Sequence, residues 1–162
     1  MPPRTTVDLL RDVAANHGER EAYVDAGAGV RLTFAEWDRA ADGVAAHLHD
    51  RGVRKGDVVA LFLPSSADYA IAYQAAMRLG AVTTGVNLRL GPAEVGHILR
   101  LAEPKVVLTE ESRSELAEAA TLDAPPLPRL DPTDDVAIVW TSGTTGVPKG
   151  AVFDHECFRA TA

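Results

Sequence analysis

Short apolar runs alternate with helical patterns along most of the chain. Four β-branched or apolar runs predict buried strands, namely Val58–Leu63, Ala81–Val86, Val106–Thr109 and Val136–Trp140. Helical spacing or helix-start residues separate them in Ala67–Leu79, in the segment opened by Gly91-Pro92 and in Glu111–Ala120. This alternation predicts an α/β fold, with a mainly parallel sheet flanked by helices.

The first part of the chain has a different pattern. The segment Thr6–His17 is an amphipathic helix by its periodicity, and Ala22–Asp25 and Val30–Thr33 are predicted to be short strands. Thr33 and Glu36 have the spacing of a capping box, and a long helix is expected behind them. Because the two early strands are short and poorly periodic, we expect them to lie outside the main sheet.

Composition narrows the class of protein. The chain has 162 residues, 46% of them hydrophobic, and a formal net charge of −7, which argues against nucleic-acid binding. No apolar run is long enough to span a bilayer, and the N-terminus has no apolar core of a secretory signal. The single cysteine, Cys157, excludes an internal disulfide and fits a reducing compartment, so a cytoplasmic location is expected.

A loop rich in glycine and hydroxyl residues, TSGTTGVPKG, follows the last predicted strand. Its glycines allow a ligand to approach the backbone N–H groups, its hydroxyls are donors, and Lys149 adds a positive charge, which together suit a polyphosphate. The Walker A pattern is not met, because Pro148 stands where that pattern counted from Gly143 needs glycine. The alternative is a plain surface turn. The predicted phosphate-binding residues are Thr141, Ser142, Gly143, Thr144, Thr145, Gly146 and Lys149.

The stretch WTSGTTGVPKGAVFDH resembles the phosphate-binding signature of the AMP-forming acyl-CoA synthetase and adenylation-domain superfamily. That signature has an aromatic residue before T-S-G-[ST]-T-G-x-P-K-G, and a histidine a few residues later. Trp140 replaces the more usual tyrosine, and His155 has the spacing of the histidine, for which local support of the loop is expected. Three further segments resemble the superfamily in the right order, so that the resemblance covers nearly the whole chain: Leu32–Trp37, Gly52–Val59, and Leu79–Ala81 with Asn87–Leu90.

The resemblance implies a ligase that activates a carboxylic acid with ATP as acyl-AMP and then transfers it to the thiol of coenzyme A. In that reaction the loop holds the β- and γ-phosphates, Lys149 counters the charge of the leaving pyrophosphate, and Thr141 is a candidate hydroxyl for reaching Mg²⁺. The form Asn87-Leu88-Arg89-Leu90 is more similar to ligases of fatty or aryl acids than to peptide-synthetase adenylation domains. An adenylation domain, and a non-catalytic remnant or interaction module, stay as alternatives.

In this superfamily the acyl pocket, the adenine contacts, the Mg²⁺-binding glutamate and the catalytic lysine lie beyond the loop. Residues 1–162 are therefore expected to be the N-terminal part of the large adenylate-forming domain, without the C-terminal domain and inactive alone. The remainder of the enzyme as a separate chain is one possible partner. No catalytic residue and no protein metal site are predicted within these residues.

Overall fold

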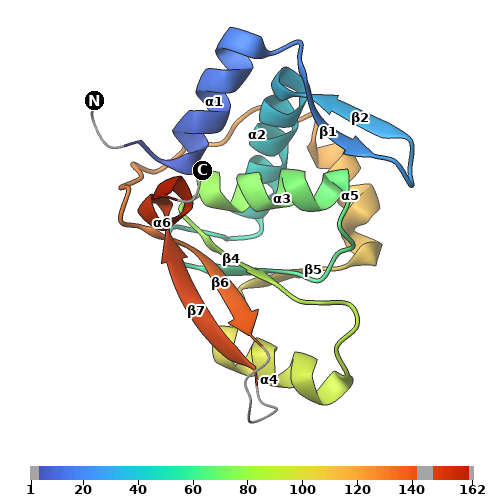
Figure 1. Cartoon of the computed structure of the whole chain (residues 1–162), viewed down its shortest axis with the longest axis vertical. Coiled ribbons are helices and arrows are strands. Elements are labelled where there is room, and N and C mark those ends of the chain that lie inside the picture. Colours follow the sequence, from blue (N-terminus) through green and yellow to red (C-terminus); the bar gives the residue numbers. More distant parts are fainter. Residues whose placement is uncertain (1–3, 142–147, 161–162) are drawn as a thin grey trace.

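The computed structural model describes residues 4–141 and 148–160 (Figure 1). Within these ranges the central sheet has five strands in the order β5-β3-β4-β6-β7. They are β3 (Val58–Leu61), β4 (Val82–Gly85), β5 (Val106–Leu108), β6 (Asp135–Thr141) and β7 (Lys149–Asp154). The first four strands of that order pair in parallel, and only β7 is antiparallel. The predicted α/β fold with a mainly parallel sheet is confirmed.

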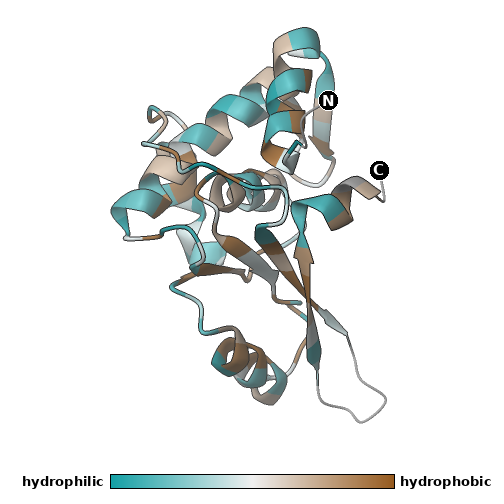
Figure 2. Cartoon of the chain, turned by 90° about the vertical axis from the view of Figure 1, so that its left-hand side faces the viewer, coloured by the Kyte–Doolittle hydropathy of each residue, from teal (hydrophilic) through white to brown (hydrophobic). Residues whose placement is uncertain are grey.

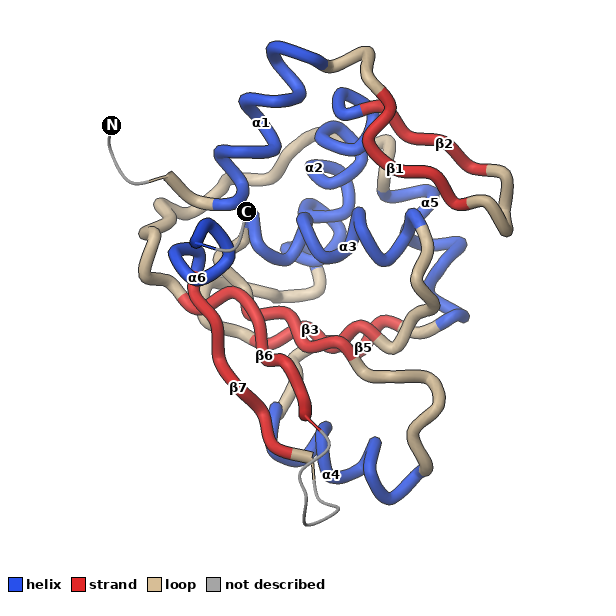
Figure 3. The backbone as a smooth tube through the Cα atoms, viewed as in Figure 1, coloured by secondary structure: helices blue, strands red, loops and turns tan. Residues whose placement is uncertain are grey.

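Helices cover both faces of the sheet (Figures 1 and 3). One face carries α2 (Phe34–Asp50), α3 (Ala67–Arg78) and α5 (Arg113–Ala119), which follows the short 3-10 helix η1 (Glu110–Ser112). Helix α4 (Pro92–Ala102) lies on the other face.

The alternation of side chains along β3 explains both layers. Val59 and Leu61 belong to the large core that includes residues of α2 and α3, whereas Ala60 belongs to a separate cluster with Ile98 of α4. Successive residues of a strand point to opposite faces, so a continuous apolar run is needed to bury both. Figure 2 shows the resulting concentration of hydrophobic residues in the strands.

The N-terminal elements lie outside this sheet, as predicted. Helix α1 (Thr6–His17) packs beside α2, and β1 (Glu21–Asp25) and β2 (Val30–Thr33) form a separate antiparallel pair. The capping box is confirmed, because the backbone N–H and the hydroxyl of Thr33 donate to Glu36 Oε2 over 2.8 and 2.9 Å. The bond from the Thr33 backbone has the larger effect and the bond from its hydroxyl the next, and together they hold the pKa of Glu36 below its usual value.

A buried ion-pair network joins three helices. The fully buried Arg78 of α3 contacts the carboxylates of Asp38 and Asp42, both on α2. Asp42 also accepts a 2.9 Å hydrogen bond from Arg11 of α1. Arg78 thus joins α3 to α2, and Arg11 joins α1 to the same carboxylate of Asp42.

Candidate functional site

The predicted phosphate loop connects two strands of a hairpin. Thr141, the last residue of β6, stands opposite Lys149, the first residue of β7. These two predicted site residues are therefore brought together at the end of the hairpin next to the loop. Ser142, Gly143, Thr144, Thr145 and Gly146 lie outside the described residues. The sequence prediction missed β7, because it assigned Lys149 and Gly150 to the loop.

Side-chain contacts hold the end of the hairpin next to the loop. The Thr141 hydroxyl donates to the Lys149 carbonyl over 3.4 Å, and the indole N–H of Trp140 donates to Thr84 Oγ1 over 2.7 Å. A Cβ at Gly150 would lie 2.8 Å from Ile138 Cγ2 and 3.3 Å from the Trp140 ring, so a side chain there would push these neighbours away. The Lys149 residue itself is exposed, which leaves its ammonium group accessible to an anion at the mouth of the loop.

His97 is a site residue that the sequence reasoning did not identify. It lies on α4, and its Nε2 is 3.1 Å from the carbonyl oxygen of Pro148, directly before Lys149. A carbonyl only accepts, so this bond requires the proton on Nε2. His97 and Pro148 are 51 positions apart in sequence, and only the fold shows that α4 supports the base of the hairpin.

His155 does not support the loop, contrary to the prediction. It lies after β7, at the end of that strand away from the loop, where its fully buried ring contacts α1. Its Nδ1 accepts from the backbone N–H of Thr6 over 3.2 Å and lies 2.8 Å from the Thr6 hydroxyl. Burial lowers the pKa of His155, which keeps the ring neutral in the folded protein. The role of His155 is to join the C-terminal end of β7 to α1.

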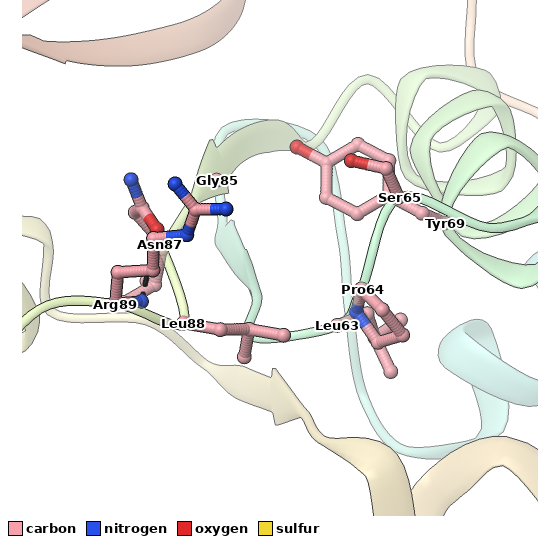
Figure 4. A pocket seen from close by; sticks show the side chains of 9 residues that line it. Leu63, Pro64, Ser65, Tyr69, Gly85, Asn87, Leu88 and Arg89 are labelled. Atoms are coloured by element: carbon pink, nitrogen blue, oxygen red, sulfur yellow. Dashed lines mark hydrogen bonds between the residues drawn. The ribbon is translucent and has the colours of Figure 1, made fainter.

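A cavity of about 550 Å³ opens where β3 and β4 end (Figure 4). Ligands of open α/β sheets bind beyond the carboxyl ends of the strands, and this cavity lies at that edge. Its polar lining comes from the segments after the strands and from α3, and its apolar lining includes a proline and aliphatic side chains. The lining residues are Leu63, Pro64, Ser65, Tyr69, Gly85, Val86, Asn87, Leu88 and Arg89.

The cavity is close to the hairpin across the sheet. Strand β4, which ends at Gly85, pairs with β6 in the register Thr84↔Ile138, and β6 continues from there into the loop. Neighbouring strands lie roughly 4.8 Å apart. The cavity and the predicted phosphate loop therefore lie at the same end of the sheet, beyond the carboxyl ends of its parallel strands.

The described residues contain neither a metal-binding cluster nor a membrane-spanning helix. Over residues 4–141 and 148–160, no group of three or more His, Cys, Asp and Glu side chains could hold a metal ion. None of the helices in that same part of the chain is long and apolar enough to cross a membrane.

Comparison with known proteins gives matches that cover almost the full length of this chain. The family model described as AMP-binding enzyme matches residues 10–162. A long-chain-fatty-acid–CoA ligase of Mycobacterium tuberculosis is 32% identical over 95% of this chain and 36% of its own length. A hybrid PKS-NRPS synthetase of Penicillium oxalicum is also 32% identical, over 97% of this chain and 4% of its own length.

A solved structure shows the same fold. The inhibitor-bound N-terminal domain of FACL13 from Mycobacterium tuberculosis superposes with a TM-score of 0.84 and 32% identity, over 94% of this chain and 45% of that one. The chain thus spans about a third of the length of the curated ligase it matches.

Proposed function

Because the chain belongs to the AMP-binding enzyme family, we propose that it is the N-terminal part of an AMP-forming acid–thiol ligase. The complete enzyme would activate a fatty or aryl carboxylic acid with ATP as acyl-AMP, and then transfer the acyl group to the thiol of coenzyme A. The observation that carries this proposal is the sequence TSGTTGVPKG, which begins at the carboxyl end of the parallel strand β6. The reducing compartment indicated by the single cysteine supports a cytoplasmic location.

In this proposal the chain contributes phosphate binding and alignment. Transfer reactions at phosphorus need positioning and charge neutralisation more than covalent help from the protein. The ladder between β6 and β7 fixes both ends of the loop, and the exposed Lys149 provides a cation beside it. The predicted ligands Thr141, Ser142, Gly143, Thr144, Thr145, Gly146 and Lys149 would then surround the β- and γ-phosphates of ATP.

The described residues do not form a Mg²⁺ site of their own. They include no cluster of carboxylates or histidines suitable for a metal, and the Thr141 hydroxyl donates to the Lys149 carbonyl. Magnesium is commonly bound through substrate phosphates, water and one or two carboxylates. We therefore assign no step of the reaction to a metal held by these residues.

An adenylation domain of a peptide synthetase is the second candidate. The likeness to a PKS-NRPS synthetase favours it, because the match covers 97% of this chain. The segment Asn87-Leu88-Arg89-Leu90 favours the CoA ligase, since adenylation domains usually carry an Asp-Pro-x-Tyr-Pro stretch there. The acceptor distinguishes the two functions, because the complete enzyme would load either free coenzyme A or a carrier-protein thiol.

The test of the proposed function is the replacement Lys149→Ala, with ATP affinity measured by titration calorimetry on the chain. Loss of a charge-assisted contact should cost roughly 1.5–3 kcal/mol, which corresponds to a rise in Kd of about 10- to 150-fold. Lys105→Ala is the matched control, because Lys105 is exposed and precedes β5 at the opposite edge of the sheet. Equal ATP affinities of the two variants would show that the hairpin is not a phosphate site.

A further inference from the structure

We propose that Thr84 is a positioning residue for the predicted phosphate loop, and that it acts through the indole ring of Trp140. The Thr84 side chain is fully buried on β4, which lies between β3 and β6. Trp140 directly precedes Thr141, the first residue of the TSGTTGVPKG segment. The role of this pair in phosphate binding rests on the proposed function, whereas the contacts that define the pair do not.

The Thr84 hydroxyl makes two hydrogen bonds to β6. It accepts from the indole N–H of Trp140 over 2.7 Å and donates to the Ile138 carbonyl over 3.3 Å. A hydroxyl has a single proton to donate, so the bond to Ile138 directs the oxygen lone pairs of Thr84 toward the indole. The branched side chain of threonine also has few rotamers. The hydroxyl is therefore a fixed point to which the indole ring is held.

The Trp140 ring in turn spans the two strands of the hairpin. Trp140 on β6 is paired with Gly150 on β7, and the next pair along the hairpin is Thr141 with Lys149, where the strands meet the loop. A Cβ at Gly150 would lie 3.3 Å from Cη2 and from Cζ3 of the ring, so the ring covers the backbone of β7 at this glycine. The ring also packs against the cluster that includes Ile98 of α4. A row of contacts thus runs from β4 across β6 to β7, directly behind the two ends of the loop.

This row should matter for ligand binding because it fixes the ends of the loop before the ligand arrives. A loop that is already ordered in its bound conformation loses less conformational entropy on binding. Without the Thr84 hydroxyl the indole N–H has no partner on β4, and leaving such a donor unsatisfied inside the protein is costly. Since Trp140 is only partly buried, we expect its ring to turn toward water and to uncover Gly150.

The experiment compares Thr84→Val with Thr83→Val. Both threonines are fully buried, and Thr83 likewise donates to a carbonyl of β6, that of Val136 over 2.9 Å. Successive residues of a strand face opposite sides of the sheet, so Thr83 points away from Trp140. In titration calorimetry, Thr84→Val should weaken ATP binding by about three- to tenfold, the equivalent of one hydrogen bond. Thr83→Val should bind ATP as the unsubstituted chain does, and so should Thr84→Ser, which keeps the hydroxyl.

A second measurement separates positioning from a general loss of stability. Urea midpoints should fall in both valine variants, because each loses a buried hydrogen bond. Hydrogen exchange of the Trp140 indole N–H, followed by NMR, should become faster in Thr84→Val and stay unchanged in Thr83→Val. The chain has two tryptophans, so Trp37→Phe assigns the two indole signals.

Equal ATP affinities of Thr84→Val and Thr83→Val would overturn the proposal, and so would an unchanged exchange rate of the Trp140 indole. A loss of affinity in Thr84→Ser as large as that in Thr84→Val would also overturn it, because the hydroxyl would then not be the group that matters. The proposed function fails in a different way. In that case the unsubstituted chain does not bind ATP, or Lys149→Ala binds it as tightly as Lys105→Ala, and the role of Thr84 in phosphate binding fails with it.

Discussion

Replacing Arg78 with alanine should destabilise the fold more than any surface charge change. Among the described residues, Arg78 is the largest side chain that is fully buried, and its guanidinium contacts Asp38 and Asp42 of α2. Removing it takes away the cation that contacts Asp38, and leaves Asp42 with Arg11 of α1 as its partner. It also leaves a void between α2 and α3, which are extensively packed together.

The size of the effect follows from the exposure of the partners. Breaking a buried ion pair by removing one member costs roughly 3–5 kcal/mol. The side chains of Asp38 and Asp42 keep 25% and 21% exposure, so water can solvate them in part. We therefore expect a loss near the lower limit, about 3 kcal/mol, which is a large share of the ~5–15 kcal/mol that stabilises a typical domain.

Urea unfolding followed by circular dichroism measures this loss. With a slope of roughly 1–3 kcal/mol per molar urea, the midpoint should fall by about 1–3 M. Arg31→Ala is the control, because the pair of Arg31 with Glu21 is exposed and should contribute less than about 1 kcal/mol. The triple variant Arg78→Met, Asp38→Asn, Asp42→Asn should recover part of the loss, since no buried charge is left uncompensated and Arg11, which loses Asp42, has a side chain that is 41% exposed. A loss below about 1 kcal/mol for Arg78→Ala would refute the reasoning.

Three further predictions concern packing, pH and the hairpin. Gly43→Ala should destabilise the chain by roughly 1–3 kcal/mol in urea unfolding, because the added Cβ would lie 2.2 Å from the last backbone carbonyl oxygen of α5; Gly96→Ala, whose Cβ meets only a flexible side chain at 3.5 Å, should not. Because burial lowers the pKa of His155, the unfolded chain takes up its proton first, and stability should fall as the pH drops below about 6.5; a pH dependence between 7.5 and 5.5 that is unchanged in His155→Gln would contradict this. His97→Ala should weaken ATP binding about 2- to 12-fold through loss of the bond to Pro148, with calorimetry as the measurement and an unchanged urea midpoint as the check on folding.

Most of the fold could be predicted from local pattern. Strand positions were correct to within two residues for β3 and β5, because their apolar runs are buried by helices on both faces. The capping box at Thr33 and Glu36 was correct because it depends on four consecutive residues. Strand β7 was missed because Gly150 and Ala151 have weak strand propensity, and its stability comes from pairing with β6.

The site was predictable only as far as a contiguous motif could show it. The loop could be found because its donors are neighbours in sequence, and its strand position follows from the run before it. The contact of His97 with Pro148 and that of His155 with Thr6 join residues 51 and 149 positions apart. Neither contact has a local signal. The cavity beside Arg89 likewise requires two segments that only the pairing of β3 with β4 brings together.

The hairpin form of the candidate site has an electrostatic consequence. In nucleotide-binding folds whose glycine-rich loop opens a helix, the aligned peptide dipoles of that helix add roughly half a positive charge at the phosphate. Here the chain returns from the loop as the antiparallel strand β7, and strands have almost no net dipole. The field at this loop must therefore come from side chains and from individual amides. Binding of a polyphosphate here should depend on the charge of Lys149 more steeply, and weaken more with added salt, than binding at a helix-based loop.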